Sequence, residues 1–360
     1  MTLRVSWTLG IVLCLSVLTG CVPTPTSAPE DVVNIGSGGT YVLCEGLWQQ
    51  NNAVLSYIAP SQQVVRDVVS TVNAGERIGD TASDLLRIGN DLVVVVSTSR
   101  TLLVLDAATG VRKQTIAMPN AQPYRIATDG NGKMWVTNVG DDSITEIATD
   151  AMTVSVPRVV VGPAPEGICT LRNYLYVGLS GMGDLRKDEP GAGTIIVLRQ
   201  SDLAAVDTIG SVPNVADLVA DQQRDRVWAS YRHYASQPDS LGGVVMINGT
   251  TRTIDQRWLF ASPADLAIDP STGAVFVLHE DGIDVITDPQ KASQRIIDHT
   301  SGGGSDVWYS LSYDARTGHL LVGNARSYVT DGEVIEVALD GDIVRRWSVG
   351  LNPTAYVLLP

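Results

Sequence analysis

A pattern that recurs about every 45 residues constrains the fold of this chain more than any other feature. In each copy, apolar runs of four to six residues alternate with turns rich in Gly, Asp and Asn, which is the pattern of strands rather than helices. Neighbouring copies are 41 to 50 residues apart, and their first strand-like runs begin at Asp84, Arg125, Gly167, Asp217, Asp265, Ser310 and Ala355. A four-stranded propeller blade has about this length. The sequence therefore predicts an all-β fold, a seven-bladed β-propeller.

The two ends of the repeat region are incomplete in complementary ways. The segment from Tyr41 begins with what looks like a second strand and lacks a first, whereas residues 353–360 form a first strand with no blade after it. We expect the C-terminal strand to complete the N-terminal blade, because this closes the ring and removes an exposed sheet edge. Six or eight blades are the alternatives, since the first and sixth copies are degenerate.

The N-terminal residues have the pattern of a targeting segment. Arg4 precedes an apolar run from Leu9 to Leu18, which is too short to span a bilayer because a spanning helix needs about 20 apolar residues. The run ends in Leu18-Thr19-Gly20-Cys21. This resembles the lipobox of bacterial lipoproteins, in which the cysteine receives acyl chains such as palmitate and becomes the new N-terminus. The alternative is an ordinary secretory signal with a cysteine near its cleavage site.

These features divide the chain into three parts. We expect a lipoprotein signal peptide at residues 1–20, a proline-containing flexible tether at 21–38 that starts with the lipidated Cys21, and the propeller at 39–360. Val22 replaces the Asp that usually retains enterobacterial lipoproteins in the inner membrane. The outer membrane is therefore the predicted location, and the sequence leaves open whether the protein faces the periplasm or the cell surface.

Charge and cysteine content exclude several functions. The chain has 25 Lys and Arg against 39 Asp and Glu, a net charge of −14, which gives nucleic acid no global attraction and disfavours adsorption on anionic lipid. Cys44 and Cys169 lie in apolar strand-like runs and are expected to be buried free thiols, with a disulfide as the alternative in an oxidising compartment. No Cys or His spacing indicates a metal site, and we expect no cofactor.

Extra length is concentrated in the loops between the second and third strands of three copies, at 179–193, 231–243 and 325–332. These loops share one face of a propeller, here called the top face, and functional residues are usually carried on such loops. Arginine forks pair with anionic oxygens and aromatic rings stack on planar groups, so this face favours an anionic aromatic ligand. The candidate ligand-binding residues are Trp48, Tyr124, Arg125, Arg186, Arg232, His233, Tyr234, Asp265, Tyr309, Arg326 and Tyr328. The alternative is that these side chains are solvated and pair with nearby acids, among them Asp188, Glu189 and Asp239.

Acidic residues also recur in the register of the innermost strands. Asp84, Asp217 and Asp265 occupy the same place in their copies, and Arg125 occupies it in another. They form either a cation site at the mouth of the central channel or, as we expect, hydrogen bonds to the amides of neighbouring strands.

The repeats, of which residues 123–147 are the clearest, resemble the YncE-like, or YVTN-type, β-propellers. Within that group, Glu45-Gly46-Leu47-Trp48 followed by Gly79-Asp80-Thr81-Ala82-Ser83-Asp84 is similar to the N-E-G-x-W…G-D-T-A-x-D pattern of bacterial cell-surface lipoproteins, with Cys44 in place of the usual Asn. The resemblance covers residues 40–360 and implies the propeller fold and the lipid anchor. It also implies, for some members, transfer of an iron–siderophore or similar cargo to a TonB-dependent receptor.

Three functional hypotheses follow. The first is an outer-membrane lipoprotein that binds a small ligand, such as an iron–siderophore, on its top face. The second is a scaffold for protein–protein interaction at the cell envelope. The third is a propeller lyase or lactonase, since the third blade resembles the repeats of streptogramin lyases. Such an enzyme needs a histidine base or a metal in the central funnel, and only His233 and His279 are placed for that role. Motifs of other enzyme classes are absent from the sequence, and we expect no catalytic activity.

Overall fold

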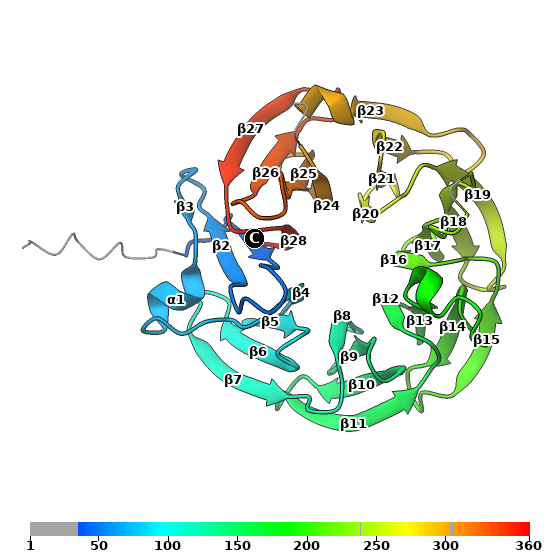
Figure 1. The fold of residues 1–360 in the computed structure, drawn as a ribbon, viewed down its shortest axis with the longest axis horizontal. Coiled ribbons are helices and arrows are strands. Elements are labelled where there is room, and N and C mark those ends of the chain that lie inside the picture. The colour runs from blue at the N-terminus through cyan, green and yellow to red at the C-terminus, as the bar shows by residue number, and fades with distance from the viewer. Residues whose placement is uncertain (1–34, 238, 303–305) are drawn as a thin grey trace, which may run out of the picture. The chain divides into compact units, whose positions relative to one another are not determined.

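The computed structural model describes residues 35–360, apart from residue 238 and residues 303–305. The predicted signal peptide, Cys21 and most of the predicted tether lie outside the described residues. Seven four-stranded antiparallel sheets surround a central axis (Figure 1). The predicted seven-bladed propeller is confirmed, and the alternatives of six or eight blades are wrong.

Each blade has its first strand at the channel and its fourth at the rim. Blades 1 to 4 are made, from the channel outward, of β28 (Pro353–Leu358), β1 (Thr40–Cys44), β2 (Val54–Ile58) and β3 (Val64–Val65); β4 (Ala82–Ile88), β5 (Asp91–Val96), β6 (Thr101–Asp106) and β7 (Arg112–Ala117); β8 (Pro123–Thr128), β9 (Lys133–Asn138), β10 (Ser143–Ala148) and β11 (Thr153–Val160); and β12 (Pro165–Leu171), β13 (Tyr174–Leu179), β14 (Thr194–Arg199) and β15 (Ala205–Ile209).

Blades 5 to 7 repeat the arrangement. They are made of β16 (Val215–Asp221), β17 (Arg226–Tyr231), β18 (Gly242–Asn248) and β19 (Ile254–Phe260); β20 (Asp265–Ile268), β21 (Val275–His279), β22 (Gly282–Ile286) and β23 (Gln294–Asp298); and β24 (Trp308–Asp314), β25 (His319–Asn324), β26 (Glu333–Val337) and β27 (Ile343–Ser348). The described helices are short: α1 (Val68–Val72), η1 (Gly183–Leu185) and η2 (His299–Gly302).

The ring closes as the sequence predicts, because β28 pairs antiparallel with β1 and supplies the first strand of blade 1. Arg316, in the turn after β24, holds this closure from the neighbouring blade. Its Nη1 donates to the carbonyl oxygens of Gly38, Gly39 and Leu359 at 2.7, 3.0 and 2.8 Å. Its Nε and Nη2 bind Asp314 at 2.9 and 2.7 Å. One guanidinium therefore ties both ends of the described chain to blade 7.

The core consists of seven apolar clusters, each of which lies between two consecutive blades. Strand β5 shows why the middle strands are continuously apolar. Val94 packs toward blade 1 and Val93 toward blade 3, since successive side chains of a strand point to opposite faces. Burial of each such side chain stabilises the fold by about 1.5–3 kcal/mol. The blades are therefore held together by the same residues that make up their sheets.

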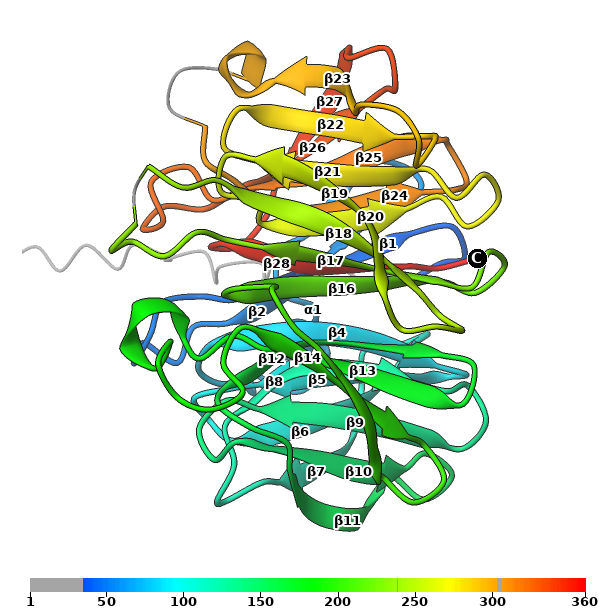
Figure 2. The ribbon, with the colours of Figure 1, turned by 90° about the vertical axis from the view of Figure 1, so that its right-hand side faces the viewer.

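The two faces of the ring differ in loop length. On the bottom face, turns such as 129–132 and 172–173 are short, and the C-terminus lies there (Figure 2). Gly36 at the start of the described chain is held on the same face, because its amide donates to the Tyr57 hydroxyl at 2.9 Å. The top face carries the long loops between β13 and β14, β17 and β18, and β25 and β26. The predicted asymmetry of the two faces is thus present.

Both cysteines of the propeller are free and buried, as predicted. Burial raises the pKa of Cys44 to about 12, against smaller opposing effects of Ser56 and the Gly350 backbone. In the described part of the chain, no helix has the length and apolar character needed to cross a bilayer.

Candidate functional site

Six side chains surround the top end of the central channel, and we call this set the channel mouth: Glu45, Tyr124, Arg125, Glu166, Arg232 and Tyr309. They come from blades 1, 3, 4, 5 and 7. Tyr124 lies close enough to Arg125, Glu166, Arg232 and Glu45 for all four charges to act on its hydroxyl. Burial is the largest of the effects on Tyr124 and raises its pKa. The mouth is thus one electrostatically connected site.

Glu45 and Tyr309 make a short hydrogen bond in the channel mouth. The Tyr309 hydroxyl donates to Glu45 Oε2 at 2.5 Å, across the junction between blades 7 and 1. Burial raises the pKa of Glu45, and the bond from Tyr309 opposes that shift. Burial and the charge of Glu45 together raise the pKa of Tyr309. The Tyr309 ring also meets the Tyr328 ring edge-on, with centroids 6.0 Å apart.

The loop that carries Glu45 is shaped by its own sequence. Gly46 has a φ of +79°, and a Cβ there would lie 2.6 Å from Asn52 Oδ1 and 2.7 Å from the Ala53 nitrogen. Asn52 Oδ1 accepts the Leu47 amide at 2.8 Å, and the Asn352 amide group donates to the Gly46 oxygen at 3.0 Å. Glycine after Glu45 is therefore required by the turn that aims Glu45 at the channel.

The loop that follows Glu45 and the segment from Gly79 to Thr81 meet in space. The Asp80 carboxylate accepts the amides of Gln49 at 3.0 Å and of Asn51 at 3.3 Å. The Ala53 amide donates to the Gly79 oxygen at 3.2 Å. The G-D-T segment thus holds the loop on which Trp48 stands, and the Trp48 side chain is 68 % exposed above it.

Arg125 lies below the rim and is held by blade 2. Its Nη1 donates to the Ser83 oxygen at 3.2 Å and lies 3.9 Å from Asp84 Oδ1, while its guanidinium lies 5.4 Å from the centre of the Tyr124 ring. Burial disfavours the charge on Arg125, but Asp84, Tyr124 and Asp217 outweigh it and raise the pKa of Arg125. Arg125 is therefore a fixed cation that is already paired.

Glu166 and Arg232 form the opposite side of the mouth. Ser180 donates to Glu166 Oε1 at 2.7 Å, and burial raises the pKa of Glu166 against the charges of Arg232 and Arg125. Arg232 is exposed, and its guanidinium has no hydrogen-bond or ion-pair partner within residues 35–237, 239–302 and 306–360. Arg232 is thus free to bind an anionic group that enters the mouth.

Below the mouth, the channel encloses a cavity of about 230 Å³ lined by the innermost strands. Asp84, Asp217 and Asp265 each accept the amide of the next blade's first strand, at 2.9, 3.1 and 2.7 Å. The prediction that these acids bind neighbouring strands is confirmed. Burial, and then the charge of Asp217, raises the pKa of Asp265 well above its ordinary value. Among the described residues no group of three or more His, Cys, Asp and Glu is arranged to hold a metal ion.

The structure separates several predicted residues from the mouth. Arg186 makes a two-pronged pair with Asp142 at 2.7 Å for both contacts and also binds Glu189 at 2.7 Å. Arg326 forms an ion pair with Glu333 of its own blade. The outer arginines Arg186 and Arg326 are thus neutralised by acids, as the alternative expected, and one of these acids, Asp142, comes from another blade.

The remaining predicted residues line the rim or lie beside it. Trp48 and Tyr328 are exposed at 68 % and 46 %, and they stand on loops of blades 1 and 7. Burial raises the pKa of Tyr234, and a hydrogen bond with the Asn214 backbone opposes this shift. His233 Nδ1 is buried and has no partner in the described part of the chain. His279 is buried against the Phe260 ring at 4.9 Å and does not line the channel cavity. Its predicted place in the funnel is therefore wrong.

Sequence reasoning did not select Glu45 as a site residue, although it stands in the quoted E-G-x-W motif. A charged residue directly before a glycine at the end of an apolar strand-like run was the available signal. Glu166 was not selected either, and its contact with Ser180 was not foreseen.

These observations define a class of protein: a closed seven-bladed propeller with a polar channel mouth under long top-face loops. Residues 38–339 match the model of a family described as "Domain of unknown function (DUF5074)", and the chain belongs to this family. No curated protein matches the chain.

Two solved structures resemble the fold. One is hydrazine synthase of Kuenenia stuttgartiensis, with 16 % identity over 76 % of this chain and 88 % of that chain, at a TM-score of 0.63. The other is a quinoprotein alcohol dehydrogenase-like protein of Bacteroides thetaiotaomicron, with 12 % identity over 89 % of this chain and 78 % of that chain, at a TM-score of 0.66. Both likenesses concern the propeller fold alone.

Proposed function

We propose that this protein is an outer-membrane lipoprotein, anchored through Cys21, that binds a small ligand at the channel mouth. The observation that carries the proposal is the mixed polar set at the mouth, where the free Arg232 guanidinium acts on the half-buried Glu166 carboxyl group and Arg125 acts on that of Glu45. Such convergent polar groups at the mouth of a closed β fold are typical of ligand sites.

The mouth favours a ligand of mixed character. Arg232 offers a fork for one anionic group, and the rings of Tyr124 and Tyr309 offer planar contact. Glu45 and Glu166 each have one oxygen bonded within the protein, by Tyr309 and Ser180, so the other oxygens remain for donors on the ligand. An iron–siderophore with an aromatic, anionic chelating group and amide donors is the first candidate, and a TonB-dependent receptor is the proposed recipient.

The mature chain with Cys21→Ser, which is secreted without lipid, tests binding. Its tryptophan fluorescence is titrated with a panel of ferric siderophores. We expect Arg232→Gln to weaken binding about tenfold, the loss of one charge-assisted hydrogen bond. Arg100→Gln is the matched control, because Arg100 also stands on a top-face loop but donates to the Pro119 oxygen at 3.2 Å. Equal affinities of the two variants would remove Arg232 from the site.

The anchor needs a separate experiment. Cells that express the full chain are fed a palmitate analogue, and the membranes are fractionated. Label that is present in the wild type and absent in Cys21→Ser supports the lipoprotein. Label in both proteins, or in neither, contradicts it.

The second candidate is a protein-binding scaffold, which one observation favours. Large apolar side chains are exposed on four top-face loops: Trp48, Met182, Leu185, Leu241, Tyr328 and Val329. Exposed apolar side chains that gather on one face are typical of protein interfaces. Crosslinking from Leu185→Cys in intact envelopes separates the candidates, since a scaffold yields one discrete protein adduct whether or not siderophore is supplied.

A further inference from the structure

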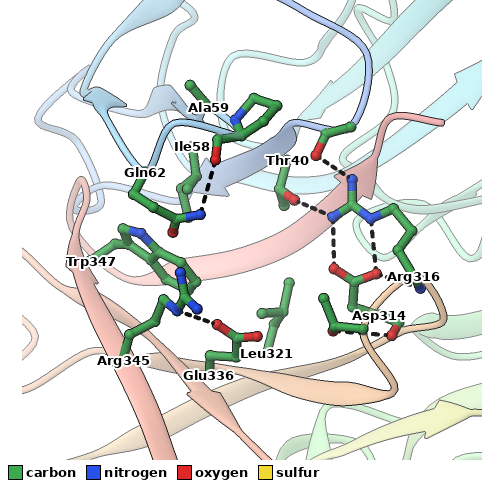
Figure 3. Close-up of a pocket in the computed structure, with 13 residues that line it drawn as sticks. Thr40, Ile58, Ala59, Gln62, Asp314, Arg316, Leu321, Glu336, Arg345 and Trp347 are labelled. Carbon is green, nitrogen blue, oxygen red and sulfur yellow. Dashed lines mark hydrogen bonds and ion pairs between the residues drawn. The ribbon is translucent and has the colours of Figure 1, made fainter.

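A second cavity lies on the bottom face, between blades 7 and 1, and we call it the seam pocket. Its volume is about 360 Å³, within the range of small-molecule sites. Figure 3 shows its walls: Trp347 and Arg345 on one side, Asp314 and Arg316 on the other, and the Ala59–Gln62 turn above. The pocket lies at the opposite end of the blades from the channel mouth, so the proposed function does not use it.

The apolar part of the seam pocket is built from both blades. Ile58 and Leu321 are buried members of the cluster between blades 7 and 1, and the Trp347 indole packs against that cluster from the rim. Pro60 completes this wall from the turn after β2. A flat apolar group that enters the pocket would therefore contact aliphatic side chains on one side and an indole on the other.

Both acids of the seam pocket are already paired with cationic or ring nitrogen groups of the protein. Asp314 accepts three contacts from Arg316, through its backbone amide, Nε and Nη2. Glu336 accepts His319 Nδ1 at 2.7 Å on one oxygen and Arg345 Nε at 2.8 Å on the other. A cationic ligand thus finds no free carboxylate in the pocket.

The two arginines of the seam pocket, Arg316 and Arg345, differ in how many guanidinium nitrogens are bonded within the protein. All three nitrogens of the Arg316 guanidinium are used for ring closure and for Asp314. Arg345 uses only Nε, and its Nη1 and Nη2 have no partner in the part of the chain that the structure describes. Its guanidinium lies 5.7 Å from the centre of the Trp347 ring. In Figure 3 the free end of Arg345 points past the indole toward Gln62.

Gln62 stands at the lip in a left-handed conformation, with a φ of +75°. Its side-chain amide donates to the Pro60 oxygen at 3.1 Å, so it is turned back onto its own loop.

We propose that the seam pocket binds a small aromatic carboxylate. The ring lies between Trp347 and the Ile58–Leu321 wall, and the carboxylate accepts from Nη1 and Nη2 of Arg345. The two-nitrogen end of a guanidinium matches the two oxygens of a carboxylate, and the indole beside it matches the attached ring. This is a second site, distinct from the channel mouth in both position and chemistry.

The test uses 2-naphthoate as the probe, with uncharged 2-naphthamide and cationic 2-naphthylmethylamine as matched compounds. Binding to the mature Cys21→Ser chain is followed by saturation-transfer NMR and tryptophan fluorescence. We expect 2-naphthoate to bind with a Kd of about 0.1 mM, typical of a ligand of this size, and the amide about tenfold more weakly. The amine is expected not to bind. Equal binding of all three probes would overturn the proposal.

Variants locate the site. Arg345→Gln is expected to weaken 2-naphthoate about tenfold and to leave 2-naphthamide unchanged, whereas Trp347→Leu weakens both. Arg345→Lys keeps a positive charge beside Glu336 but lacks the two-nitrogen end of a guanidinium. It therefore tests whether 2-naphthoate binding needs that two-nitrogen geometry while the ion pair with Glu336 is preserved. Arg257→Gln is the matched control, because Arg257 also lies over an aromatic ring, Tyr231, at 4.9 Å.

The same titration separates this proposal from the proposed function. Loss of 2-naphthoate binding in Arg232→Gln, with binding intact in Arg345→Gln, would place the probe in the channel mouth and overturn the seam pocket. Loss of siderophore binding in Arg232→Gln, with 2-naphthoate unaffected, is the result that both proposals expect.

Discussion

Tyr309 and Glu45 are separated by 264 residues in the sequence, yet the tyrosine hydroxyl donates to the carboxylate at 2.5 Å across the junction where the ring closes. Burial raises the pKa of Glu45, and this bond is the largest effect that opposes the shift. The contact therefore links closure of the propeller to the electrostatics of its channel mouth.

Tyr309→Phe is expected to destabilise the protein by about 1–3 kcal/mol, because Glu45 loses its donor in a buried site. The variant raises the pKa of Glu45 further. The loss is therefore larger above that folded-state pKa, where the carboxyl must ionise, than below it, where Glu45 is protonated. Urea unfolding at pH 5 and pH 8 measures the difference. Tyr328→Phe, whose hydroxyl is at the surface, is the control, and equal effects of the two variants at both pH values would contradict the prediction.

Asp265→Asn is expected to flatten the pH dependence of stability. Burial and Asp217 raise the folded-state pKa of Asp265, so the folded state binds this proton more tightly than the unfolded state. Wild-type stability from this group is therefore present at low pH and falls as pH rises through the folded pKa, by about 1.4 kcal/mol per unit between the two pKa values. Asparagine keeps an acceptor for Leu311 and removes the charge.

The measurement is the difference in unfolding free energy between Asp265→Asn and the wild type from pH 4 to pH 8. It should move in favour of the variant as pH rises. Asp340→Asn, at the exposed turn between β26 and β27, should show no such trend. A difference that stays constant with pH would show that Asp265 is ionised throughout.

Arg316→Gln is expected to destabilise the protein by roughly 3 kcal/mol, because it releases the backbone at both ends of the described chain and leaves Asp314 without its cation. Chemical unfolding measures the loss. Arg199→Gln is the control, since Arg199 pairs with Asp202 on the surface at 2.6 Å and such pairs contribute about 1 kcal/mol or less. Similar losses in both variants would mean that the closure contacts add nothing.

Asp80→Ala is expected to loosen the loop that carries Trp48. The amides of Gln49 and Asn51 lose their shared acceptor, which costs about 1–2 kcal/mol of local stability. Hydrogen exchange in residues 47–52 should accelerate roughly tenfold while the strands of blade 4 stay unchanged. Unaltered exchange in this loop would show that Asp80 does not hold it.

Cys44 and Cys169 are expected to resist thiol reagents in the folded chain. Burial raises the pKa of Cys44 to about 12 and also raises that of Cys169, so neither forms thiolate at neutral pH. The Cys21→Ser chain should react with a chromogenic disulfide only after denaturant is added. Reaction of the native chain, or a mass that changes on reduction, would contradict this.

Much of the fold was predictable because each blade repeats one local pattern. The innermost strands were aligned correctly from Asp84 to Ala355, and the closure by β28 followed from a missing first strand. The site was less accessible to sequence reasoning. Tyr124, Arg125, Arg232 and Tyr309 were selected and do meet at the channel mouth, but Arg186 was selected for a charge that Asp142 neutralises.

The sequence by itself predicted a ring of seven blades, with six or eight left open, as well as the way the ring closes and the face that carries the long loops, because strand period and turn residues are local properties. Only the tertiary structure decided which charges remain free. Arg186 and Asp142 lie 44 residues apart in the sequence, and Tyr309 and Glu45 lie 264 apart. Such pairs depend on how the loops of neighbouring blades are positioned relative to each other. Arg232 and Arg345 keep unpaired nitrogens for the same reason, since among the described residues no acid of an adjacent blade lies within ion-pair distance of those nitrogens.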